Sequence, residues 1–170
     1  MHETTEFAVR ALMIGAGATV VMDVWAVFLK RFFGIPSLDY AMVGRWLGHL
    51  PRGRFVHDSI GKAVPVRCER IIGWAAHYAI GMIFAAFLIG AMGLDWARQP
   101  TFLPALLTGM VTVAAPFFIL QPGLGVGIAA SKTPRPNVFR LRSLMAHTAF
   151  GVGLYLSAWV VAMLLQRVSA

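Results

Sequence analysis

Four long runs of apolar residues, nearly free of charged side chains, constrain this chain more than any other feature of its sequence. They cover residues 7–29, 71–94, 101–120 and 143–165. Each is close to the ~20 residues that a helix needs to cross the ~30 Å hydrocarbon core of a bilayer. Of the 170 residues, 58% are hydrophobic and 13% are charged, whereas soluble domains are about half apolar and a quarter charged. We therefore predict an all-α integral membrane protein, a four-transmembrane-helix bundle, with residues 1–170 as a single membrane domain.

Basic residues are concentrated in two of the three segments that connect these runs. Residues 30–70 contain eight Lys or Arg and three acidic residues, residues 121–142 contain four Lys or Arg and no acid, and residues 95–100 are neutral. Lys and Arg accumulate in the cytoplasmic loops of membrane proteins. We therefore predict that the loops at 30–70 and 121–142 are cytoplasmic and that both termini lie on the opposite side of the membrane.

The placement of the basic residues also limits the partners. They lie between apolar runs and do not form a separate basic domain with interleaved aromatic residues, so nucleic acid is not an expected partner. Besides the lipid bilayer itself, an anionic lipid or a membrane protein is the partner that such loops would bind. The sequence does not determine the oligomeric state.

A short amphipathic helix is predicted within the first basic loop. Apolar residues recur every four positions over residues 38–50, and Ser37 is a suitable N-cap. We expect this helix to lie at the headgroup level of the membrane, with Trp46 and Arg45 as interfacial anchors. The glycines and prolines of residues 121–137 predict a tightly folded segment, which is re-entrant in one interpretation.

Polar side chains of the four runs are predicted to meet in one layer near the cytoplasmic ends. At a rise of about 1.5 Å per residue, Asp23 and His77 lie roughly 9 Å, and His147 roughly 6 Å, inside the cytoplasmic ends of their runs. Gln121 closes the third run on the same side. Small residues at four-residue spacing share the helix faces of Asp23, His77 and His147, and membrane helices approach closely along such faces. We expect these three side chains to point towards one another, with Glu69 covering them from the loop.

Two interpretations of this layer differ in energy. An ionisable side chain at the bilayer centre costs on the order of 2.5–3.5 kcal/mol, whereas an interhelical hydrogen bond contributes about 0.6 kcal/mol on average. This difference favours a functional site. The alternative is a structural staple, in which Asp23 accepts hydrogen bonds from His77 and His147 and thereby joins three helices.

The residue types permit several chemistries. Two imidazoles and a carboxylate are a common ligand set for zinc or ferrous iron, and a ligand from the loop would complete it. The candidates for that ligand are Glu69, Cys68, His49 and His57. An Asp–His pair facing the cytoplasm also suits a proton relay. An enzyme acting on a lipid or a quinone would require a cleft beside the layer.

Haem is a further option, with His77 and His147 as its two axial ligands. Gly81 and Gly151 follow these histidines by four residues, and in this interpretation the glycines leave space for the macrocycle. Asp23 would then act by orienting a ligand histidine.

Five segments resemble, in their order and spacing, a family of bacterial membrane proteins catalogued as domain of unknown function 2938. They are GATVVMDVWA, GRWLGHL, GWAAHYAIG, APFFILQPGLGVGIAASKTPRP and SLMAHTAFGVGLY. The resemblance covers nearly the whole chain and implies a small bacterial inner-membrane protein with four helices, but no activity. The family positions that fall on this sequence include Asp23, Trp25, Arg45, Trp46, His57, Glu69, Trp74, His77, Gln121, Pro122, Ser131, Pro134 and His147.

We therefore predict a multi-pass inner-membrane protein with both termini in the periplasm. It binds a metal or a small ligand, with or without proton transfer, at Asp23, His77, His147 and Glu69. The supporting residues are Trp74, Tyr78, Gln121, Arg45, His57, Ser131 and Lys132. The alternatives are an accessory or assembly subunit of a membrane complex, in which the layer is a staple, and a haem protein. A divalent metal is preferred to haem as a cofactor, and the sequence leaves open whether the protein is an enzyme.

Overall fold

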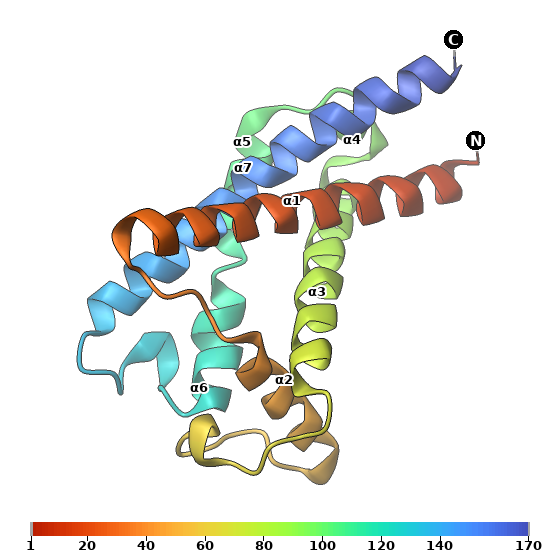
Figure 1. Cartoon of the computed structure of the whole chain (residues 1–170). Helices are drawn as coiled ribbons and strands as arrows, with labels where there is room; N and C mark the ends of the chain where they lie inside the picture. Colours follow the sequence, from red (N-terminus) through yellow and green to blue (C-terminus); the bar gives the residue numbers. More distant parts are fainter. Residues whose placement is uncertain (1, 170) are drawn as a thin grey trace.

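The computed structural model describes residues 2–169, and every regular element in that range is a helix (Figure 1). Four segments are long and apolar enough to cross a membrane, which confirms the predicted all-α fold with four candidate spans. They are α1 (Glu3–Phe33), α3 (Glu69–Met92), the segment Phe102–Leu124 and α7 (Pro136–Ser169). Helix α7 begins at Pro136, before the predicted residue 143, because proline is well suited to the first helical turn. At its other end the helix extends beyond the apolar run, to Ser169.

Small residues set the packing of the long helices. α1 packs on both α3 and α7, and α5 (Phe102–Val111) packs on α7. Gly15 of α1 lies against the backbone of α3 at Met82, and Gly153 of α7 lies against the backbone of α1 at Ala18. Glycine allows helix backbones to approach this closely. The predicted small-residue faces of α1 and α3 therefore meet, whereas α7 meets α1 at Gly153, which lies off the predicted face of His147 and Gly151.

The third candidate span is not one regular helix. α5 ends at Val111, a π-helical turn follows at Pro116–Leu120, and α6 (Gln121–Leu124) is followed by Gly125, which has a positive φ of 92°. Proline lacks the N–H that a regular helix requires and displaces the preceding turn. A continuous span over residues 101–120 was predicted, and Pro116 accounts for the difference.

The first loop folds back onto the long helices. We call residues 34–68 the folded loop; it contains α2 (Tyr40–His49), η1 (Leu50–Arg52) and η2 (Ile60–Lys62). The predicted amphipathic helix is therefore present. Its N-cap, however, is Asp39, whose carboxylate accepts a hydrogen bond from the Ala41 N–H at 3.0 Å, and not Ser37.

The predicted membrane anchors of this helix make contacts within the protein. The Trp46 indole donates to the Phe55 carbonyl at 2.8 Å and lies against Gly123 of α6. Arg45 is bound to Glu69 at the start of α3. The folded loop thus joins α3 to α6, because its polar groups find partners there.

The charges at the opposite end of the molecule are also paired. η4 (Ile128–Ala130) lies on the side of the folded loop, whereas α4 (Leu94–Arg98) and both termini lie at the other end (Figure 1). Glu6 is bound to Arg10 at 2.8 Å and to Arg98 at 2.7 Å. This explains how an arginine and a glutamate can lie near the start of an apolar helix.

Candidate functional site

Asp23 of α1 and His77 of α3 form the centre of the site. The Nε2 atom of His77 lies 3.0 Å from Oδ1 of Asp23, and the two side chains are 12% and 19% exposed. The pair was predicted from depth and helix face, and the geometry agrees. Close packing of α1 on α3 brings them together, because Gly81, one turn beyond His77, lies against Thr19, one turn before Asp23.

Two tyrosines complete the hydrogen bonds of this pair. The Tyr40 hydroxyl lies 2.9 Å from the same Nε2 atom of His77, and the Tyr78 hydroxyl donates to Oδ2 of Asp23 at 3.1 Å. Burial raises the pKa of Tyr40, and the nearby Asp23 carboxylate raises it further. The Tyr40 hydroxyl therefore keeps its proton. The Nε2 atom thus lies between a hydroxyl and a carboxylate, an arrangement suited to proton transfer.

Aromatic rings surround His77 on the side of the folded loop. The Tyr40 ring centroid is 4.3 Å from that of His77 and 4.3 Å from that of Trp74, and the Tyr78 centroid is 5.6 Å from that of His77. Rings at these separations are in contact. The cluster fixes the orientation of the imidazole, and the Tyr40 ring lies over one of its faces.

A groove runs along α3 beside this cluster. It is shallow and open to its surroundings, with a volume of about 500 Å³, and residues of α3 alone line it: Arg70, Ile71, Trp74, Ala75 and Tyr78. Its lining is mostly apolar, with Arg70 at the end near the folded loop. Tyr78 belongs both to the groove and to the cluster, since its hydroxyl donates to Asp23. A molecule in the groove would therefore lie one side chain away from the Asp23–His77 pair.

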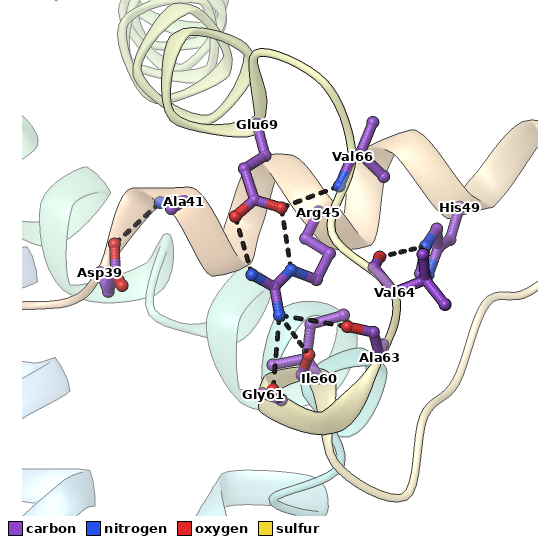
Figure 2. Close-up of polar contacts among 10 residues, drawn as sticks. All are labelled: Asp39, Ala41, Arg45, His49, Ile60, Gly61, Ala63, Val64, Val66 and Glu69. Carbon is purple, nitrogen blue, oxygen red and sulfur yellow. Dashed lines mark hydrogen bonds and ion pairs between the residues drawn. The ribbon is translucent and has the colours of Figure 1, made fainter.

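Glu69 was predicted to cover this cluster from the loop, but it does not. Figure 2 shows its carboxylate bound by the Arg45 guanidinium, with Nε–Oε2 and Nη2–Oε1 distances of 2.8 and 2.7 Å, and by the Val66 N–H. The Glu69 hydrogen bonds raise the pKa of Arg45. The remaining guanidinium nitrogen, Nη1, lies near the carbonyls of Ile60, Gly61 and Ala63 (Figure 2). Glu69 and Arg45 therefore organise the folded loop.

His147 is likewise separate from Asp23. Thr112 Oγ1 donates to the Gly109 carbonyl at 2.6 Å and lies 2.9 Å from Nδ1 of His147. The hydroxyl has one proton, so Nδ1 of His147 is the donor in the second contact. The face of α7 that carries His147 packs on α5, where Gly151 meets Gly109. His147 therefore bonds to Thr112 and not to Asp23, although it is close enough to His77 to interact with it electrostatically.

The other predicted supporting residues lie elsewhere on the side of the folded loop. Gln121 donates to the Ser143 hydroxyl at 3.2 Å, and His57 contacts His49. Ser131 and Lys132 follow η4, where both lie close to Gly127. Trp74 and Tyr78 are the two supporting residues that belong to the Asp23–His77 cluster.

The donor set limits the cofactors that fit. Within residues 2–169, no group of three or more His, Cys, Asp or Glu side chains is arranged to hold a metal ion, so the predicted metal site is not supported. Haem does not fit between His77 and His147. The Tyr40 ring lies against His77, Gly81 packs against Thr19, and Gly151 packs against α5. These glycines allow contact between helices and leave no space for a macrocycle.

Sequence reasoning missed Tyr40. This residue begins α2, and it reaches His77 only because the folded loop lies against α3. The sequence signal for this contact is one glycine in α2 and one glycine in α3. Gly44 lies against the Glu69 carbonyl and Gly73 lies against the Tyr40 carbonyl.

Comparisons with known proteins agree with the resemblance noted in the sequence. The model of a family described as "Protein of unknown function (DUF2938)" matches residues 12–161. No curated protein and no solved structure matches the chain. The match covers most of the chain, including the Asp23–His77 cluster, and brings no activity with it.

Proposed function

We propose that this chain, which belongs to the family described as "Protein of unknown function (DUF2938)", binds a small membrane-soluble ligand beside Asp23 and His77. The ligand is an amphiphile, with an apolar part in the groove along α3 and a polar head that exchanges a proton with the cluster. The observation that carries the proposal is the position of Tyr78, which lines the groove and donates to Asp23.

The chemistry of the groove supports this class of ligand. Ile71, Trp74 and Ala75 offer an apolar surface, and Arg70 offers a positive charge at one end. Arginine near the membrane surface attracts anionic or strongly polar headgroups. Intramembrane carboxylates and imidazoles commonly belong to ligand or proton pathways, and Tyr78 connects Asp23 to the groove. A metal is not proposed, because Asp23 and His77 are two ligands and the described chain adds no third.

The staple remains the competing function, and one observation favours it. Asp23, His77, Tyr40 and Tyr78 bond to one another from three helices, so the cluster joins α1, α2 and α3 without any ligand. In that case the protein is an accessory or assembly subunit. The two functions differ in whether the groove binds anything.

Trp74 provides the test. We expect decylubiquinone or a brominated phosphatidylglycerol, added to the purified protein in detergent, to quench its fluorescence in a saturable manner. Trp74→Phe should remove the saturable part, whereas Trp159→Phe, at an exposed position on α7, should keep it. Asp23→Asn should weaken binding about tenfold, as expected for the loss of a charged hydrogen-bond partner.

The two probes separate a quinone-type head from a lipid head. Saturation that responds to Asp23→Asn supports the proposal. If neither probe saturates, and Asp23→Asn lowers the thermal stability of the protein, the cluster is a staple and the proposal is overturned.

We further propose that the folded loop faces the cytoplasm of a bacterial inner membrane and that both termini are periplasmic. The excess of Lys and Arg in residues 30–70 and 121–142 supports this orientation. These basic loops are also the surface that we propose for an anionic lipid or a membrane protein partner.

Cys68 tests the orientation, because it is the single cysteine and is exposed. We expect a membrane-impermeant maleimide to label Cys68 in inside-out vesicles and to leave it unlabelled in intact spheroplasts. Thr4→Cys in a Cys68→Ser background is the matched control, since Thr4 is exposed near the other end. It should show the reverse pattern. Labelling of Cys68 in intact spheroplasts would show that the orientation is inverted.

A further inference from the structure

Two buried histidines outside the Asp23 cluster contact each other directly. His49 ends α2 and His57 lies in the folded loop, and these residues are 3% and 7% exposed. Nδ1 of His49 lies 2.8 Å from Nε2 of His57. At this separation the two nitrogens share a hydrogen bond, so one of them must carry a proton.

The outer nitrogen of each ring faces a backbone carbonyl. Nε2 of His49 lies 3.1 Å from the Val64 oxygen, and Nδ1 of His57 lies 3.1 Å from the Gly123 oxygen. A carbonyl oxygen only accepts hydrogen bonds. Both outer nitrogens must therefore be donors.

Counting protons then determines the state of the pair. A neutral imidazole carries one N–H, so two neutral rings carry two. If both protons are on the outer nitrogens, the inner nitrogens face each other with lone pairs alone. If one proton moves inward, a carbonyl faces an unprotonated nitrogen. The three contacts require three protons.

We propose that His49 and His57 form a proton-binding site, which holds one extra proton between the two rings and makes the pair a buried monocation. This inference goes beyond the proposed ligand site, and its test does not depend on that site. The site joins α2 to the later part of the folded loop, which carries His57 and Val64, and to α6, because Gly123 belongs to α6. Loss of the proton breaks one of the three contacts and loosens the folded loop from α6.

The charges around the pair are compatible with a cation. Glu69 at the start of α3 is close enough to His49 to interact with it electrostatically, and it shares its charge with Arg45 of α2. The other charged residues of the folded loop are Asp39, Arg52, Arg54, Asp58, Lys62 and Arg67, and α6 has none. In the described chain neither ring is paired with a carboxylate. The carbonyls of Val64 and Gly123 are therefore the groups that stabilise the charge directly.

Nuclear magnetic resonance of the whole protein tests the proton count. The protein is labelled with ¹⁵N-histidine in detergent micelles near neutral pH, and the signals are assigned with His49→Gln and His57→Gln. We expect three protonated nitrogens in the pair and a scalar coupling between Nδ1 of His49 and Nε2 of His57. Two protonated nitrogens, or no coupling between the inner nitrogens, would overturn the proposal.

The pH dependence of stability gives a second test. If the folded pair keeps a proton that the unfolded histidines have lost, the free energy of unfolding falls as the pH rises. The fall is expected on the alkaline side of the ordinary titration range of histidine.

His57→Gln should flatten the fall, because its amide can donate to a neutral His49. His2→Gln, at an exposed position, is the matched control and should keep it. An equal fall in the wild type and in His57→Gln would contradict the shared proton. If His57→Gln does not fold, the resonance experiment on the wild type decides, with the signals of the pair identified by the scalar coupling between their inner nitrogens.

Discussion

Replacing Gly73 with alanine is expected to lower the free energy of unfolding by about 2–3 kcal/mol and to separate the folded loop from α3. A Cβ at Gly73 would collide with the carbonyl of Tyr40, and the reciprocal position, Gly44, lies against the carbonyl of Glu69. The atoms in the way belong to helix backbones, so no side-chain rotation can relieve the overlap. Thermal unfolding in detergent, followed by circular dichroism, measures the loss.

Gly90→Ala is the matched control for this prediction. Gly90 lies in the same helix, α3, and a Cβ there would meet nothing within 4 Å. Alanine is favoured over glycine inside a helix by about 0.5–1 kcal/mol, so this variant should be as stable as the wild type or slightly more so. Equal stability of Gly73→Ala and Gly90→Ala would show that α2 and α3 do not touch.

Replacing Arg45 with methionine is expected to cost about 2–3 kcal/mol, because it leaves Glu69 without its partner. The guanidinium donates twice to Glu69 and reaches three carbonyls of the folded loop (Figure 2). The side chains are 15% and 18% exposed, so the loss is smaller than for a fully buried pair. Trypsin should then cleave the folded loop at Arg52, Arg54 or Lys62 much faster than in the wild type.

Two further variants sharpen this result. Arg45→Lys keeps the charge but cannot form both bonds of the planar guanidinium, so it should lie between the wild type and Arg45→Met. Arg31→Met removes an exposed arginine of α1 and should leave both stability and cleavage unchanged. Similar cleavage of Arg45→Met and Arg31→Met would show that the Arg45–Glu69 pair does not hold the folded loop.

The position of His147 shows which features of the site could be predicted from the sequence and which could not. Its depth and its helix face were predicted, and Gly151 on the same face does lie against another helix. The neighbouring helix, however, is α5, so His147 contacts Thr112 and not Asp23. Depth and periodicity place a side chain on its own helix. They do not say which helix packs against that face.

For Glu69 and for the N-cap of α2, the prediction from the sequence differed from the structure in another way. Glu69 was expected at the Asp23 cluster, but Arg45 binds it. Ser37 and Asp39 are both good N-caps, and Asp39 is the one used. The start of α2 at Tyr40 makes Asp39 the N-cap, and Arg45, on a different helix from Glu69, determines where the Glu69 carboxylate lies.

The number of candidate spans, the presence of α2 and the approach of Asp23 to His77 could be predicted from the sequence alone. The spans and α2 follow from local patterns, because a hydrophobic run or an amphipathic repeat is complete within about 10–25 residues. The approach of Asp23 to His77 was predicted because small residues lie on the helix faces that carry these two side chains, and in the structure these faces meet. The tertiary structure alone decided the Tyr40 contact, the place of Glu69 and His147, the groove along α3 and the His49–His57 pair. These depend on the folded loop returning to α3 and α6, and on backbones that approach closely at single glycines.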